Sequence, residues 1–172
     1  MAYVLTALIA RSELLRGARE PTVVTLPQGM GLVPLVRKGR AGQIAQPLLR
    51  GWEGRHAPDA DFESPEERQR CIDSATAAFD EIATRCARIS FAPGGAVAYV
   101  EAEYWAGSGN QAAFVWVEGE PVLGPIVADD AINRALARIG VEPGFAGDPF
   151  SGLDLGRFRS NEDWLALAEG RS

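Results

Sequence analysis

The fold is decided by residues 96–118, which read AVAYVEAEYWAGSGNQAAFVWVE. Two runs of strand-forming residues flank a Gly-rich centre, and this pattern predicts a β-hairpin. If residues 107–110 form the turn, Glu103 pairs with Phe114 and Glu101 with Trp116. Side chains alternate along a strand, so one face of the hairpin is apolar and is expected to pack on a long helix. That face carries Val100, Ala102, Tyr104, Ala113, Val115 and Val117.

The opposite face carries two carboxylates beside two large aromatic rings: Glu101, Glu103, Phe114 and Trp116. One interpretation is a half-solvated sheet surface, partly covered by the C-terminal coil. A second is an outward-facing surface that binds a protein partner, because aromatic anchors with nearby charge suit recognition. A third is an acid/base pair, since same-face neighbours can approach the separation of about 5–9 Å that glycosidases use.

The Gly-rich centre of the hairpin adds Ser108, Asn110 and Gln111 to the candidate partner-binding residues. Its glycines permit the positive φ angles of a tight or bulged turn. A phosphate cradle is disfavoured, because no helix follows to offer its N-terminus.

A long helix is predicted to begin at Ser64-Pro65-Glu66-Glu67. Ser64 is a typical N-cap, proline suits the first helical position, and Glu67 completes a capping box. Apolar residues then recur at helical spacing as far as Cys86, so the helix spans about residues 65–89.

The other elements follow from shorter patterns. Residues 37–62 read as an irregular excursion with one short helix or strand near 44–49, and residues 141–158 read as an ordered coil over the core. Strands are predicted at 3–9, 22–26, 32–36 and 121–126, a helical turn after Ser12, and shorter helices at 130–139 and 160–168. We therefore predict a single α+β domain over residues 1–172: a mainly antiparallel sheet packed against one long helix, with two shorter helices.

Composition narrows the class of protein. The chain has 172 residues and a net charge of −6, which argues against a nucleic-acid-binding protein. Residues 1–50 hold seven basic and two acidic residues, and the remainder holds ten basic and 21 acidic. An acidic body can steer a basic partner towards it, although a charged surface also simply maintains solubility.

Cysteines and hydropathy indicate the compartment. Cys71 and Cys86 lie fifteen residues apart in one predicted helix, too far for a disulfide, so both are expected to be reduced and Cys71 to be buried. The apolar run at residues 2–10 is too short to span a bilayer and lacks the basic flank of a signal peptide. We expect a cytoplasmic protein without a membrane segment.

The sequence gives little indication of a catalytic or metal-binding site. The single histidine, His56, cannot build a multi-histidine metal site. It could form a catalytic dyad with a Ser or Cys, assisted by Asp59 or Asp61. The favoured interpretation is that His56 is an exposed loop residue without a catalytic role. The chain contains no nucleophile elbow, P-loop or zinc-protease motif. We predict no cofactor and no metal.

Residues 101–111 (EAEYWAGSGNQ), followed by Val115-Trp116, carry a family resemblance. They resemble the hairpin of small uncharacterised bacterial proteins with the pattern E-x-E-Y-F-G-G-x-G-x-Q and a later V-W pair. Residues 131–136 (AINRAL) and 155–164 (LGRFRSNEDW) resemble the C-terminal part of those proteins, whereas Trp105 and Ala106 depart from the usual F-G. The resemblance implies no established reaction, and in size and style such proteins are similar to immunity proteins of bacterial toxin systems.

Together these patterns favour a non-catalytic, cytosolic protein-binding domain, as a monomer or weak homodimer. An immunity protein that neutralises a bacterial toxin is the specific form of this hypothesis. The alternative is a small hydrolase that uses the Glu101/Glu103 carboxylate pair, or His56 with a Ser or Cys. A third hypothesis is an assembly protein whose sheet edge pairs with another copy.

Overall fold

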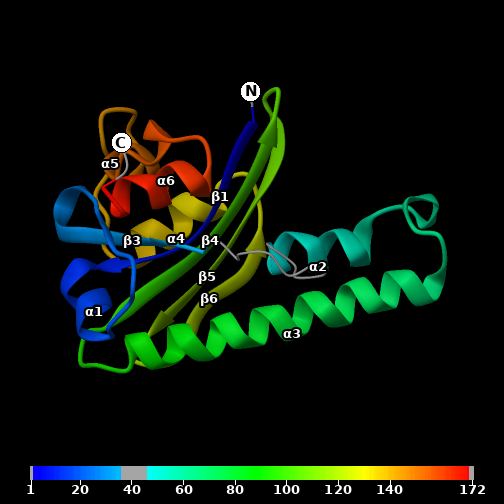
Figure 1. Cartoon of the computed structure of the whole chain (residues 1–172), viewed down its shortest axis with the longest axis horizontal. Coiled ribbons are helices and arrows are strands. Elements are labelled where there is room, and N and C mark those ends of the chain that lie inside the picture. Colours follow the sequence, from blue (N-terminus) through cyan, green and yellow to red (C-terminus); the bar gives the residue numbers. More distant parts are fainter. Residues whose placement is uncertain (1, 36–45, 171–172) are drawn as a thin grey trace.

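A computed structural model describes residues 2–35 and 46–170 of the chain. In this part, six strands form one antiparallel sheet in the order β2-β3-β1-β4-β5-β6 (Figure 1). The strands are β1 (Ala2–Arg11), β2 (Val24–Thr25), β3 (Met30–Pro34), β4 (Ala96–Trp105), β5 (Ser108–Val117) and β6 (Glu120–Val127). The predicted α+β class is confirmed.

Helices cover both faces of the sheet and divide the core in two. On one face lie α1 (Ser12–Gly17), α2 (Pro47–His56) and α3 (Pro65–Ser90). On the other lie α4 (Ala131–Arg138), α5 (Pro149–Gly152) and α6 (Asn161–Ala168), with the 3₁₀ turn η3 (Leu155–Arg157) between the last two. Two further 3₁₀ turns, η1 (Pro27–Gly29) and η2 (Asp59–Asp61), lie in connections. In the described residues, every helix is too short or too polar to cross a lipid bilayer.

The long helix α3 is confirmed, with its predicted start. Ser64 Oγ accepts a hydrogen bond from the Glu67 backbone N–H at 3.1 Å, so the N-cap is in place. Its C-terminal half packs on the sheet through residues three or four positions apart: Phe79, Ile82, Cys86 and Ile89. Its N-terminal part packs on α2 and extends beyond the sheet with it (Figure 1).

Several shorter predictions are also confirmed. The helices near 130–139 and 160–168 correspond to α4 and α6, and Ser160 caps α6 by accepting from the Asp163 N–H. Residues 141–158 cover the core through the fully buried Leu153 and Leu155, but Phe145 is exposed and the segment contains α5 and η3 where only coil was predicted. Part of the excursion predicted at 37–62 lies outside the described residues. A helix does form where a short helix or strand was predicted near 44–49, but it is longer, Pro47–His56, so the prediction that residues 50–56 are irregular is wrong.

The turn of the β4–β5 hairpin is shorter than predicted. Trp105 pairs with Ser108, so only Ala106 and Gly107 form the turn, with φ angles of 50° and 88°. Two consecutive positive φ angles are typical of the two-residue turns that match the twist of a hairpin. Gly109 belongs to the strand, where a Cβ would lie 2.0 Å from the Glu103 carbonyl oxygen. This glycine therefore permits close approach of the two backbones and does not form the turn.

The predicted orientation of the hairpin is wrong. The long helix covers the face that carries Glu101, Phe114 and Trp116, and these side chains are 0%, 8% and 4% exposed. The rings of Phe114 and Trp116 stack at 4.2 Å between centroids, and Phe79 of α3 packs against both. The other face, with Val100, Ala102, Ala113 and Val115, packs on the layer of α4 and α6. Burying large rings under the longest helix removes more apolar area from water than burying small residues there would.

The two tryptophans of this hairpin provide a direct test of that orientation. Trp116→Ala should lower the free energy of unfolding by about 3–5 kcal/mol, because it empties a packed site. Trp105→Ala should change it by less than about 0.5 kcal/mol, because that side chain is 63% exposed. Urea unfolding of both variants, followed by circular dichroism, measures the difference. Equal effects of the two substitutions would contradict the arrangement.

Candidate functional site

Glu101, the first carboxylate of the predicted pair, is a structural group in the core. Its Oε1 accepts hydrogen bonds from the Leu48 N–H at 2.8 Å and the Tyr99 hydroxyl at 2.5 Å. Its Oε2 accepts from the Leu49 N–H at 2.8 Å. Both amides belong to the first turn of α2, whose own N-cap residue, Gln46, makes no side-chain cap. Glu101 therefore caps α2 from the sheet and places a carboxyl at the positive end of the helix dipole.

Burial raises the pKa of the Glu101 carboxyl from 4.5 to about 7. The hydrogen bonds from Tyr99, Leu49 and Leu48 and the charge of Arg50 act in the opposite direction and reduce the effect of burial on this pKa. Both oxygens are occupied by these donors, and the side chain has no exposed surface. A substrate therefore has no access to this carboxyl.

Glu103, the second carboxylate of the pair, lies apart from the core at a surface hollow. We call this the Glu103 hollow: a cavity of about 210 Å³ lined by Leu49, Glu53, Glu103, Trp105, Ser108, Gly109 and Asn110. The Arg50 guanidinium lies 2.7 Å from Glu53 Oε2 and 3.8 Å from Glu103 Oε2. One cation thus faces two carboxylates here. Glu101 does not line the hollow, so the two predicted acids do not converge on one cleft.

The other predicted nucleophiles and bases do not assemble either. His56 is exposed, with Nδ1 2.8 Å from the Trp52 carbonyl oxygen and its ring stacked on the Trp52 indole at 4.9 Å. Cys86 is buried, and burial raises the pKa of its thiol. Cys71 is partly exposed, contrary to the prediction that it is buried, and both thiols are free. Among residues 2–35 and 46–170, no three His, Cys, Asp or Glu side chains cluster as metal ligands would.

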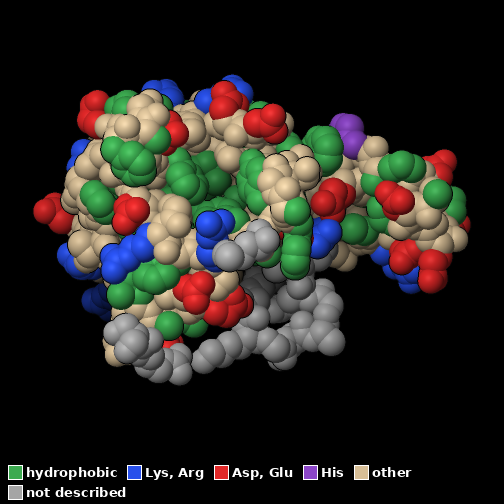
Figure 2. All heavy atoms as spheres, turned by 90° about the horizontal axis from the view of Figure 1, so that it is seen from above, with side chains coloured by type: hydrophobic (Ala, Val, Ile, Leu, Met, Phe, Trp, Pro, Cys, Tyr) green, Lys and Arg blue, Asp and Glu red, His purple; other side chains and the backbone are tan. Residues whose placement is uncertain are grey.

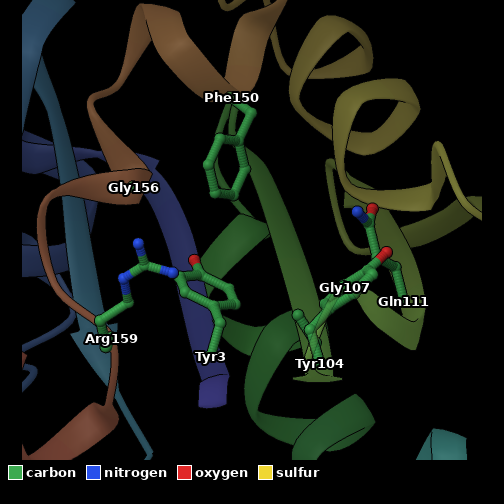
Figure 3. Close-up of a pocket in the computed structure, with 8 residues that line it drawn as sticks. Tyr3, Tyr104, Gly107, Gln111, Phe150, Gly156 and Arg159 are labelled. Atoms are coloured by element: carbon green, nitrogen blue, oxygen red, sulfur yellow. The ribbon is translucent and has the colours of Figure 1, made fainter. Parts of the chain in front are cut away.

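A second cavity lies on the other side of the same hairpin end. We call it the Tyr3–Arg159 pocket: a cavity of about 320 Å³ lined by Tyr3, Ala102, Tyr104, Gly107, Gln111, Phe150, Gly156 and Arg159 (Figure 3). Figure 2 views the molecule from the end where this hairpin turns, and hydrophobic side chains gather there around a hollow. Gln111, predicted to share one surface with Glu103 and Asn110, lies in this second cavity.

The Tyr3–Arg159 pocket joins segments that are distant in the chain. Tyr104, Gly107 and Gln111 belong to residues 101–111, and Gly156 and Arg159 belong to residues 155–164; these are two of the stretches on which the family resemblance rests. Tyr3 and Phe150 complete the walls, with ring centroids 5.9 Å apart in an edge-to-face arrangement. The sequence patterns did not single out either ring, because each is one more apolar residue in a strand or coil.

No protein-family model, curated protein or solved structure matches this chain. The resemblance described above therefore stays a prediction.

The buried Glu101 carboxyl predicts a specific pH dependence of stability. Its folded-state pKa lies above its unfolded value, so the folded protein binds an extra proton between pH 4.5 and about 7. The contribution of Glu101 to the free energy of unfolding therefore falls as pH rises through this window. Above about pH 7 the carboxyl is ionised in the folded protein, and the full destabilisation by its buried charge is present. The side chain in Glu101→Gln cannot titrate, so this variant should lack the pH-dependent change in unfolding free energy, which is on the order of 3 kcal/mol across the window.

Denaturant unfolding of the wild type and Glu101→Gln from pH 4.5 to 8 tests this prediction. All other titrating groups are common to the two chains, so the difference in unfolding free energy isolates Glu101. Between pH 4.5 and 7 the wild type should lose stability relative to the variant. Parallel curves would show that Glu101 titrates outside this window.

Proposed function

We propose that this chain is a non-catalytic protein-binding domain that recognises its partner with the exposed end of the β4–β5 hairpin. The observation that carries the proposal is Trp105, whose indole is 63% exposed at the rim of the Glu103 hollow. Tryptophan is strongly enriched among residues that dominate binding energy, and a hollow beside it offers a complementary site for a partner side chain.

The charges at this surface favour a basic partner. Among the described residues, Glu53 and Glu103 share the Arg50 guanidinium, so these groups together give the Glu103 hollow a net negative charge. A Lys or Arg of the partner can contact these carboxylates and lie against the Trp105 ring in a cation–π interaction. The chain as a whole carries a net charge of −6, which increases the rate of encounter with a basic surface.

Only some of the partner-binding residues predicted from the sequence lie at this surface. Glu103, Ser108 and Asn110 remain in the proposed surface, whereas Glu101, Phe114 and Trp116 do not, because they are buried. An immunity protein that neutralises a bacterial toxin would be one case of such binding, supported by the resemblance of residues 101–111. A cytoplasmic location agrees with the two free cysteines, since cytosolic thiols are kept reduced.

The two competing hypotheses receive less support. A hydrolase needs both carboxyls at one cleft, and Glu101 is enclosed. Assembly through a sheet edge needs a long unpaired strand, but β2 has two residues and β6 contains Pro121 and Pro125, which donate no backbone hydrogen bond. We therefore expect a monomer.

The test is affinity capture from a lysate of the organism that encodes the chain, with three immobilised baits. The baits are the wild type, Trp105→Ala and Phe91→Ala. Phe91 is a matched control, because it is an exposed aromatic residue (80%) at the C-terminal end of α3, before the start of β4 and so away from the hairpin turn. We expect a basic protein that the wild type and Phe91→Ala retain alike. Trp105→Ala should bind it about 30-fold more weakly, as for a central anchor.

Titration of that captured protein, purified, against the three baits gives the affinities. Melting temperatures of all three should agree, since both substituted side chains are exposed. Equal retention by all three baits, or absence of any retained protein, would contradict the proposal.

A further inference from the structure

The Tyr3–Arg159 pocket has the features of a small-molecule site that is independent of the protein-binding surface proposed above. It lies on the opposite side of the hairpin from the Glu103 hollow, and the two cavities share no lining residue. Its volume of about 320 Å³ is at the lower end of the range of roughly 300–1,000 Å³ typical of ligand pockets. It also combines apolar walls with few polar groups, as such pockets do.

Arg159, an exposed residue, gives the pocket a positive charge that no described residue pairs. In the described residues, no carboxylate lies within 4.0 Å of its guanidinium and no side chain accepts a hydrogen bond from it. Figure 3 shows the guanidinium pointing into the pocket beside the Tyr3 hydroxyl. Burial raises the pKa of the Tyr3 phenol, and the nearby Arg159 charge only partly opposes this, so the hydroxyl stays neutral. Among the described residues that line the pocket, the guanidinium is therefore the group that carries a full charge.

Gln111 supplies a hydrogen-bond donor at the opposite side of the pocket. Its Oε1 accepts from the Ile132 N–H at 3.1 Å, which assigns the amide orientation and directs Nε2 elsewhere. Nε2 donates to no described residue, and Figure 3 shows Gln111 on the side of the pocket opposite Arg159. A ligand that fills the pocket thus meets a cation at one end and a neutral donor at the other.

Aromatic rings form the walls between these two polar groups. Phe150 lies on one side, and Tyr3 and Tyr104 lie on the other (Figure 3). The Tyr3 hydroxyl donates to the Leu155 carbonyl oxygen at 3.2 Å, which holds its ring in place. Flat apolar walls favour a planar ring, because ring faces and edges pack at low cost in conformational entropy.

From these features we propose that the Tyr3–Arg159 pocket binds a small aromatic carboxylate. The carboxylate pairs with the Arg159 guanidinium, the ring packs against Tyr104 and against the contacting rings of Tyr3 and Phe150, and an acceptor at the far end of the ring receives a hydrogen bond from Gln111 Nε2. A carboxylate fits better than a phosphate. A phosphate carries close to two negative charges at neutral pH, and the pocket offers a single cation in an acidic protein.

The experiment is titration of the purified full chain with 4-hydroxybenzoate, followed by calorimetry and ligand-detected NMR. This probe carries the carboxylate, the ring and the distal acceptor, and its small size predicts a dissociation constant between about 10 μM and 1 mM. Its neutral amide, 4-hydroxybenzamide, should bind at least about tenfold more weakly, because the charge-assisted pair with Arg159 is lost.

Matched variants locate the site. Arg159→Gln should weaken 4-hydroxybenzoate binding at least about tenfold by removing the cation, and Gln111→Leu should weaken it about fivefold by removing the hydrogen bond to the distal oxygen. Gln111→Leu removes the acceptor of the Ile132 N–H, so its melting temperature is compared with that of the wild type to confirm that it folds. Arg157→Gln is the control, since Arg157 lies over the Phe158 ring outside the pocket and its loss should change affinity less than about twofold.

Three results would overturn the proposal. They are absence of saturable 4-hydroxybenzoate binding up to roughly 10 mM, equal losses in Arg159→Gln and Arg157→Gln, and displacement of the probe by equimolar inorganic phosphate. The protein-binding proposal is tested separately, because Arg159→Gln should still capture the protein partner even when it no longer binds 4-hydroxybenzoate.

Discussion

The antiparallel pairing of β4 with β5, closed by the turn at Ala106 and Gly107, is the constraint on which the rest of the structure depends. It places Tyr99 opposite Phe114 and Val97 opposite Trp116, so that the large rings form one continuous surface. The long helix α3 packs on that surface through Phe79, and the small residues of the other face accept α4 and α6. The same short turn leaves the end of the hairpin uncovered, with Trp105 exposed.

Buried polar side chains then fasten helices to this sheet. Glu101 on β4 receives the first amides of α2, and Gln46 donates to the carbonyl oxygens of Leu5 and Ala102. On the opposite face, Asn161 at the start of α6 exchanges hydrogen bonds with the backbone of Thr6. Each group satisfies backbone atoms that would otherwise be buried without partners, so these residues determine where the helices sit. The carboxyl that suggests acid/base chemistry in the sequence is therefore part of the framework.

The end of the hairpin is the place where the two faces of the sheet become accessible together. Alternation along β4 sends Glu103 and Trp105 to one side and Tyr104 to the other, so each side acquires its own cavity with its own charge. The Glu103 hollow is acidic and bordered by an exposed indole, whereas the Tyr3–Arg159 pocket is aromatic with one cation. The two proposed binding sites thus lie at one strand end without sharing a lining residue.

The sequence by itself determined the local elements: the Ser64 cap predicts the start of α3, and the alternation in residues 96–118 predicts which side chains share a face. Glu103 pairs with Asn110 in place of Phe114, an even shift that preserves this alternation. Only the tertiary structure decided which face the long helix covers, because that choice depends on contacts between segments far apart in the chain. The same reason explains α2, whose N-terminal amides are capped by a residue more than fifty positions away, and the pocket that joins Tyr3, Gln111 and Arg159.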